Sequence, residues 1–349
     1  MERVGQVVLV TGVSRHLGGR FASIIGAHPS VDRVIGVDVV PPAHSIGDAE
    51  FVRADIRNPV IAKVITSERV DTVVHLNVIA TPLSAGGRTS MKEINVIGTM
   101  QLLAACQRAS SVRRLVVKSS AAVYGSGPSD PAMFTEDSAP RSLPRSGFAK
   151  DSVEVEGYVR GFARRRPDVA VSLLRMANVV GPRIRTALTD YFSLPVVPTV
   201  LGFDGRLQLV HEDDALAALR LAMASDGVGA VNVAGDGIIT VTQAVRMTGR
   251  PMLPVPMPAG GWIGQVIRRS RLADFSPEQI QFLAYGRGMD TTRMRQVLGF
   301  EPAWTTRGAF EAFLDRARPA PTRLPTLSDV VGHAERWVSG AAARPGRAS

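Results

Sequence analysis

Two glycines near the amino terminus have the spacing of a loop that holds phosphate. The apolar run Val7–Val10 leads into Gly12, and Gly18 follows after a short loop. Gly12 permits a sharp turn and a close backbone approach to a diphosphate, and Gly18 lets the next helix pack on the strand. The diphosphate would lie on the N-terminal amides of that helix. We therefore predict a dinucleotide-binding loop made of Gly12, Ser14, Arg15, His16, Leu17 and Gly18.

Asp38 ends the second predicted strand about 20 residues after the loop, where an acidic residue typically receives the ribose of a dinucleotide. Its carboxylate would accept hydrogen bonds from the ribose hydroxyls of NAD and repel the 2′-phosphate of NADP. Arg15 has the opposite tendency, because its guanidinium can stack on adenine or reach a 2′-phosphate. The residues thus favour NAD and leave NADP open.

Short apolar strands alternate with longer helical patterns in the first half of the chain. The predicted strands are residues 7–10, 33–38, 50–53, 72–76, 114–119 and 169–174. The predicted helices are residues 17–27, 59–67, 91–110 and 147–165. Repeated strand–helix–strand units wind into a parallel sheet with helices on both faces. We predict an α/β fold of this kind, a Rossmann-type doubly wound parallel sheet.

After about residue 180, Pro and Gly interrupt the regular pattern. We predict helices at 213–224 and 242–248, a strand at 230–233 and a Pro-rich bend at 251–258. The predicted domains are a cofactor-binding domain at 1–180, a smaller α/β substrate lobe at 181–318 and a loosely held tail at 319–349.

The composition argues against several other classes of protein. The 349 residues carry a net charge of +10, but only 5% are aromatic, whereas proteins that bind single strands usually interleave aromatic and basic side chains. We therefore expect no nucleic-acid partner. The lone Cys106 excludes an intramolecular disulfide, and the six histidines lack metal-ligand spacing, so no metal is expected. No stretch reaches the ~18 apolar residues of a membrane span, and we expect a cytoplasmic protein.

Short motifs follow one another in a recognisable order between residues 7 and 235. They are TGVSRHLG at 11–18, Asp38, ADIR at 54–57, VHL at 74–76, NVIGT at 95–99, SSAAVYG at 119–125, Lys150, RMANVVGP at 175–182 and VHEDD at 210–214. With these motifs the chain resembles the extended short-chain dehydrogenase/reductases, in particular the NAD-dependent epimerase/dehydratase family. The family's usual loop is TGxxGxxG, and Arg15 stands where it has the middle Gly.

The resemblance implies further cofactor contacts in the motifs after the loop. Asp55 and Ile56 would lie along the adenine. Leu76 and Val78 would lie beside the adenosine ribose and the phosphates, and Asn95 would belong to the same site.

The resemblance also implies which residues meet the nicotinamide and the substrate. Ser120 would face the nicotinamide and the substrate oxygen, and Met176 would line the nicotinamide pocket. Asn178 would meet the substrate. Lys150, one of only four lysines in the chain, would bond the nicotinamide ribose.

Ser146 stands four residues before Lys150, where the family has a Tyr that transfers a proton. A Tyr hydroxyl, pKa about 10, can be lowered by a neighbouring Lys toward neutral pH, but a Ser hydroxyl is far less acidic and shorter. The other tyrosines are not spaced to replace it. We expect the proton to pass through water, Ser146 or the substrate's own groups, with slow turnover.

Two other departures concern the substrate. Ala121 and Ala122 stand where the sugar 4,6-dehydratases of the family carry an acidic pair, so we predict no such dehydration. Leu207 stands where many nucleotide-sugar enzymes have a diphosphate-binding Arg, and Arg183, Arg185 and Arg206 are the candidates to replace it.

The leading hypothesis is an NAD(P)-binding oxidoreductase or epimerase that acts on a sugar nucleotide or another alcohol or ketone. The alternative is a catalytically weak or inactive sensor or scaffold that binds the cofactor. The helices predicted at 91–110 and 147–165 correspond to those that family members pair into a dimer, so we expect a homodimer through them.

Overall fold

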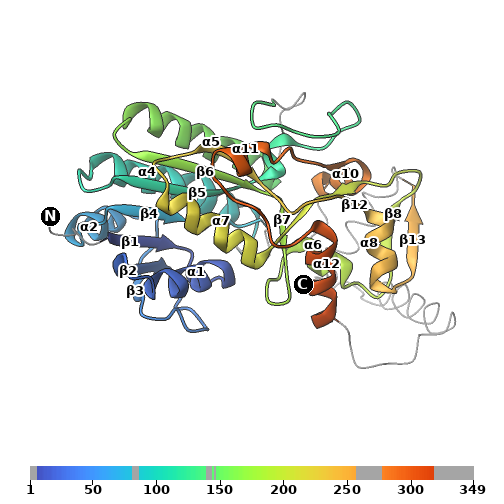
Figure 1. Cartoon of the computed structure of the whole chain (residues 1–349), viewed down its shortest axis with the longest axis horizontal. Coiled ribbons are helices and arrows are strands. Elements are labelled where there is room, and N and C mark those ends of the chain that lie inside the picture. Colours follow the sequence, from blue (N-terminus) through green and yellow to red (C-terminus); the bar gives the residue numbers. More distant parts are fainter. Residues whose placement is uncertain (1–5, 81–85, 139–143, 145–146, 257–276, 318–349) are drawn as a thin grey trace, which may run out of the picture. The chain divides into compact units, whose positions relative to one another are not determined.

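The computed structural model describes residues 6–80, 86–138, 144, 147–256 and 277–317. Seven strands of this part of the chain form one parallel sheet in the order β11–β6–β5–β4–β1–β2–β3 (Figure 1). They are β1 (Gln6–Thr11), β2 (Val31–Asp38), β3 (Glu50–Arg53), β4 (Thr72–His75), β5 (Arg114–Ser120), β6 (Ala170–Met176) and β11 (Gly229–Val233). The strand order reverses between β1 and β4, which is where ligands bind in sheets of this kind. The predicted Rossmann-type fold is confirmed.

Helices cover both faces of the sheet (Figure 1). On one face lie α1 (His16–Gly26) and α7 (Glu212–Ala224), and on the other α2 (Val60–Ser67), α4 (Thr99–Arg108) and α5 (Gly147–Arg165). In β1, Val8 and Val10 pack in the core cluster of α1 and α7, whereas Leu9 packs in the opposite cluster. Because successive strand residues point to opposite faces, a strand buried on both faces is apolar throughout.

The helix predicted at 91–110 is continuous but changes its winding. It consists of α3 (Arg88–Lys92), a π-helical stretch η2 (Glu93–Gly98) and α4. Leu102, Leu103 and Cys106 are buried against the sheet, and so they are not available to a partner subunit. Ile97 is exposed.

The part after residue 180 returns to the sheet before it forms separate elements. Although α7 and β11 lie beyond the predicted boundary, they belong to the large sheet and its cover, and the chain up to Asp315 forms one unit. We propose that the cofactor domain ends at residue 180 as predicted, except that α7 and β11, which follow later in the chain, also belong to it. The predicted tail at 319–349 lies outside the described residues.

The predicted Pro-rich bend is wrong in part. Residues Met252–Val255 form strand β13, which pairs in parallel with β8 (Val197–Val200). Pro254 lies opposite Thr199, and Pro198 opposite Leu253. Each strand has only one neighbour in this two-stranded sheet, and edge strands tolerate proline because their outward N–H groups need no partner.

The remaining elements are short. They are η3 (Ala121–Tyr124), β7 (Asn178–Val180), α6 (Ala187–Phe192), β9 (Arg206–Leu207), β10 (Leu209–His211), β12 (Ile239–Thr240), α8 (Val241–Thr248), α10 (Pro277–Tyr285), β14 (Gly286–Arg287), α11 (Thr292–Gln296) and α12 (Thr306–Ala317). Strand β9 lies between β12 and β14, and β10 pairs with β7. Among the described residues, no helix is both long and apolar enough to cross a membrane.

Candidate functional site

The glycine turn after β1 has the geometry that the sequence predicts. Gly12 has φ +83°, and a Cβ there would lie 3.0 Å from the backbone of Asn77. At Gly18 a Cβ would lie 2.2 Å from the carbonyl oxygen of Gly12. Helix α1 then begins at His16, with Arg15 as its N-cap residue. The N-terminal amides of α1 therefore open at the edge of the sheet where β1 ends.

Asp38 ties the end of β2 to this loop. Its carboxylate accepts hydrogen bonds from the Ser14 amide at 3.1 Å, from the Ser14 hydroxyl and from the Val39 amide at 2.8 Å. Asp38 is buried, and neither Ser14 nor Asp38 is among the described residues that line the cavity described next. Together they fix the path of the loop.

A cavity of about 710 Å³ lies at the carboxyl ends of the strands. Most of the predicted site residues line it: Arg15, His16, Leu17, Gly18, Leu76, Val78, Ser120, Met176, Asn178 and Arg183. These residues come from the phosphate loop and the start of α1, from the segment after β4, from the ends of β5 and β6, and from β7 and the segment after it. The fold thus brings distant motifs to one place.

Besides Gly12, Ser14 and Asp38, three further predicted cofactor residues are not among the described residues that line the cavity. Asn95 on η2 is buried, and its side-chain amide exchanges two hydrogen bonds of 2.8 Å with the backbone of Ile79. The side chain of Ile56 packs closely against Gly98, where a Cβ would lie only 2.8 Å from the Ile56 Cδ1 atom. The Arg57 guanidinium bonds Asp55 and lowers the pKa of that carboxyl. Asn95 therefore positions the segment that carries Leu76 and Val78.

The three predicted catalytic residues have different surroundings. Ser120 lines the cavity, and its Oγ accepts a hydrogen bond from the Ala122 amide at 3.2 Å. Lys150 is not among the described lining residues; its ammonium lies 3.9 Å from Glu154, and its side chain is 45% exposed. Its neighbour Ala149 does line the cavity. Ser146 lies outside the described residues.

The sequence reasoning missed Lys118 as a site residue. Lys118 lies on β5 and lines the cavity. Burial lowers its pKa to about 8, and the nearby charge of Arg15 contributes to the shift. The available signal was its position two residues before Ser120, since alternate residues of a strand share a face.

Another missed residue, Arg287, lies on the substrate side. It is on β14 directly opposite Leu207, the position where the family's diphosphate-binding Arg is absent. Its guanidinium lies 4.7 Å from the centre of the Phe282 ring and donates to Ser126 at 3.1 Å, and burial lowers its pKa to about 10. Arg287 lines the cavity, whereas the predicted Arg206 does not.

Tyr191 and Arg88 also line the cavity, and no sequence motif predicted either residue there. The Tyr191 hydroxyl donates to the carbonyl of Pro198 at 2.7 Å, and burial raises its pKa. It is therefore poorly suited to transfer a proton near neutral pH. Arg88 donates to both oxygens of the buried Asp151 at 2.6 Å and so holds the first turn of α5.

Glu212 joins the two sides of the cavity. Its fully buried carboxylate lies 3.2 Å from Nε of Arg183, 3.3 Å from the His16 imidazole and 3.6 Å from Arg20. His16 and Arg183 both line the cavity, from the phosphate loop and from the segment after β7. This cluster around the buried Glu212 thus connects the substrate segment to the start of α1.

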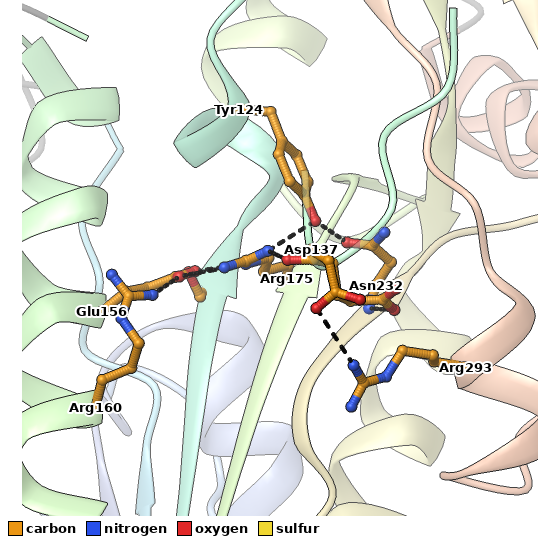
Figure 2. Close-up of polar contacts among 9 residues, drawn as sticks. Tyr124, Asp137, Glu156, Arg160, Arg175, Asn232 and Arg293 are labelled. Carbon is orange, nitrogen blue, oxygen red and sulfur yellow. Dashed lines mark hydrogen bonds and ion pairs between the residues drawn. The ribbon is translucent and has the colours of Figure 1, made fainter. Parts of the chain in front are cut away.

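A second buried network holds the strand ends that carry Ser120 and Met176 (Figure 2). Arg175 on β6 donates to both Glu156 oxygens of α5 at 2.8 and 3.0 Å, and to the Tyr124 hydroxyl at 2.9 Å. Tyr124 donates to Asn232 of β11 at 2.6 Å, and Ser119 of β5 donates to Glu156 at 2.7 Å. Burial raises the pKa of Tyr124 to about 12, which leaves this hydroxyl in a structural role.

Comparisons with known proteins agree with this geometry. The model of the NAD dependent epimerase/dehydratase family matches residues 8–234. An uncharacterized protein of Mycobacterium tuberculosis is 49% identical over 346 residues, which cover 96% of this chain and 91% of that protein. The UDP-glucose 4-epimerase of Mycolicibacterium smegmatis is 27% identical over 313 residues, 84% of this chain and 93% of the epimerase.

Among solved structures, MoeE5 in complex with UDP-glucose and NAD has a TM-score of 0.68 and 22% identity. The match covers 90% of this chain and 99% of MoeE5, and at this identity it speaks for the fold. From the family model, the related sequences and the shared fold it follows that the chain belongs to the NAD dependent epimerase/dehydratase family, a group of extended short-chain dehydrogenase/reductases.

Proposed function

We propose that this protein is an NAD-dependent epimerase or oxidoreductase that acts on a nucleotide sugar. The observation that carries the proposal is the cavity itself, whose wall combines the phosphate loop with Ser120, Met176 and Asn178. The cavity lies where the strand order reverses, the usual place for a dinucleotide in this fold.

The residues present fit NAD. The glycine turn and the amides of α1 would receive its diphosphate, and Asp38 would receive the adenosine ribose. Because a carboxylate has about four acceptor sites, Asp38 can keep its bonds to Ser14 and Val39 and still accept a ribose hydroxyl. The charge of Arg15 leaves NADP as a second ligand to test. Asp55 and Ile56 would lie toward the adenine.

On the substrate side, Arg183 and Arg287 would hold the diphosphate of a nucleotide sugar. Both line the cavity, and Arg287 lies opposite Leu207, so it supplies the cation that position 207 lacks. Asn178 would contact the sugar. Since Arg206 is not in the wall, we propose no direct contact for it.

NAD, when bound, supplies a nicotinamide ring that accepts a hydride from a substrate carbon and returns it. Ser120 would hold the oxygen of that carbon by a hydrogen bond, and Met176 would exclude water beside the ring. Lys150 would act by its charge, from the first turn of α5 next to the lining residue Ala149. The proton from the hydroxyl would pass to water, to Ser146 or to another substrate group. We expect slow turnover, because a positioned acid or base typically contributes about 10²- to 10⁴-fold.

The experiment is incubation of the purified protein with NAD and UDP-glucose or UDP-glucuronic acid, followed by separation of C4 epimers and measurement of NADH. Slow conversion would support the proposal. NADH binding without turnover on nucleotide sugars, alcohols and aldehydes would support the alternative of a sensor or scaffold.

The protein is not expected to be a 4,6-dehydratase. Ala121 and Ala122 line the cavity with methyl groups, which cannot remove a proton or protonate a leaving hydroxyl. Incubation with dTDP-glucose or UDP-glucose should therefore give no 4-keto-6-deoxy sugar by mass spectrometry. Formation of that product at a rate comparable to epimerisation would contradict this prediction.

We also propose a homodimer through the helices at 91–110 and 147–165. Support comes from Ile97 and Tyr158, two large apolar side chains that are exposed on these helices. Leu102, Leu103 and Cys106 are instead buried in the chain's own core. Sedimentation of wild type and of Ile97→Glu tests this, and a monomeric wild type would contradict it. The cytoplasmic location stays a prediction, made because no stretch of the sequence reaches the ~18 apolar residues of a membrane span.

A further inference from the structure

Lys118 carries a charge into the cavity that the described residues do not compensate. Ser119 points toward α5, where it bonds Glu156, so the alternating strand directs Lys118 and Ser120 to the other face. Lys118 lines the cavity, and among the described residues its ammonium makes no hydrogen bond or ion pair. A buried charge without a partner is costly, which favours an anion as its ligand.

A charge of the same sign, that of Arg15, acts on Lys118. The Arg15 guanidinium lowers the pKa of Lys118 in addition to the effect of burial, and both side chains line the cavity. Asp38 offsets part of the charge of Arg15. An anion that touched both side chains would relieve their repulsion and would interact with the N-terminus of α1, where Arg15 is the N-cap residue.

The strand order indicates which part of a dinucleotide reaches Lys118. β5 is separated from β2 by β4 and β1, and at about 4.8 Å per strand Lys118 lies roughly 14 Å from the strand that ends at Asp38. That is too far for the adenosine ribose. Arg15 follows β1, between the two strands, and Ser120 and Met176 at the nicotinamide side end β5 and β6. Between the adenosine ribose and the nicotinamide lie the diphosphate and the nicotinamide ribose, and of these two groups only the diphosphate carries the negative charge that a buried ammonium attracts.

We propose that Lys118 and Arg15 form a two-cation clamp for a diphosphate, namely that of the dinucleotide. The inference rests on the proposed function and extends it to two residues. Their charges replace the close backbone contact that a Gly at position 15 gives in the usual family loop. The two cations match the two negative charges of a dinucleotide diphosphate.

The test measures dissociation constants by calorimetry for wild type, Lys118→Met, Lys118→Arg and, as a control, Lys63→Met. Lys63 is exposed on α2, away from the cavity. The ligands are NADH, ADP-ribose, adenosine and UDP. Because K118M loses a charge-assisted contact, its dissociation constants for NADH and ADP-ribose should be about 10- to 100-fold higher than those of wild type. K118R should stay within about threefold of wild type because it retains the charge, and adenosine and UDP should bind K118M as they bind wild type.

A pH series adds an independent measurement. Lys118 loses its proton as pH rises through about 8, so the affinity of wild type for ADP-ribose should fall from pH 7 to 9, and that of K118M should not. Arg15 stays charged in this range, and His75, the other ionisable group near Lys118, is already neutral because its pKa is about 4. Thermal melting checks folding, and K118M should melt no lower than wild type because it removes an uncompensated charge.

Unchanged binding of ADP-ribose by K118M would overturn the clamp, and so would an equal loss for adenosine. If K118M loses affinity only for UDP, the clamp does not bind the diphosphate of the dinucleotide. The diphosphate of a nucleotide-sugar substrate would then lie between Lys118 and Arg15. If wild type binds NADH but K118M behaves identically, the clamp fails while the proposed function stands. If wild type binds none of the nucleotides, both fail.

Discussion

Lysine is rare in this chain, and the two lysines near the site have different surroundings. The side chain of Lys150 is 45% exposed on α5 and lies close to Glu154, whereas Lys118 faces the cavity from the central strand β5. A helix near the surface lets a long side chain reach solvent, but a central strand has helices on both faces and leaves a polar side chain only the cavity to enter. At the scale of single residues, the position within the sheet therefore decides which ammonium can meet a ligand.

Ser146 supports a prediction at this scale, although it lies outside the described residues. Ser146→Tyr should raise turnover at least tenfold, because a phenol four residues before Lys150 can transfer the proton that Ser transfers poorly. Rates of the epimerase reaction at pH 7–9 measure this. Ser146→Phe, which has the ring without the hydroxyl, is the control. Equal rates for the Tyr and Phe variants would exclude position 146 as the proton-transfer site.

His75 predicts a pH dependence of stability. It is buried, its imidazole bonds Thr11 and Thr99 at 2.8 and 2.9 Å, and burial lowers its pKa from 6.5 to about 4. Between pH 6.5 and 4 the unfolded chain binds a proton that the folded chain does not, so stability falls as pH falls through this window. One group shifted this far accounts for about 3 kcal/mol. Urea unfolding of wild type and His75→Gln, which keeps hydrogen-bonding groups without titrating, measures the difference. Identical pH slopes would refute this prediction.

At the scale of elements, buried ionic contacts keep the strand ends in register around the cavity. Glu212 connects the start of α7 to α1, and Arg175 connects β6 to α5 and to Tyr124 after β5 (Figure 2). His16 and Arg183 of the first network line the cavity themselves, and Arg175 of the second network directly precedes the lining residue Met176. The networks therefore hold the residues of the site in place relative to the sheet.

Glu156→Gln tests the second network. The variant keeps the shape of the side chain but leaves the buried Arg175 guanidinium without its counter-charge, which should cost about 3–5 kcal/mol of unfolding free energy. Arg160→Met removes the second cation that contacts Glu156. Because the Arg160 side chain is 55% exposed, its loss should lower the unfolding free energy by less than about 1 kcal/mol. Chemical denaturation measures both. Equal losses would mean that the network is not the source of stability at these strand ends.

At the scale of the whole molecule, the site depends on a chain that leaves the sheet after β6 and returns with α7 and β11. This return brings Glu212 to the phosphate loop, and β9 and β14 bring Arg287 opposite Leu207. The described lining residues all lie between Arg15 and Arg287. The described part of the cavity wall therefore belongs to the unit that ends at Asp315.

Removal of residues 318–349 should accordingly leave cofactor binding intact. The variant that ends at Ala317 should bind NADH with a dissociation constant within about twofold of wild type, because it retains every described lining residue. Calorimetry with both proteins measures this. A large loss of affinity in a variant that melts normally would show that the C-terminal segment contributes to the site.

The sequence by itself determined the sheet, the glycine turn and the family. Apolar runs, their alternation with helices, and the need for glycine at positions 12 and 18 are local properties, and a parallel sheet brings the ends of its strands together whatever the side chains are. The resemblance to the family predicted Ser120, Met176 and Asn178 in one site, and the three residues line one cavity because the carboxyl ends of parallel strands meet at the same edge of the sheet.

Only the tertiary structure decided which charged residues enter that cavity. Arg287 is 80 residues from Leu207 in the chain and reaches it by the pairing of β14 with β9, which no local pattern records. Lys118 has the composition signal of a rare lysine, but the sequence does not say which face of β5 is open. Charge placement depends on contacts between distant segments, and for that reason the fold could be predicted and the clamp could not.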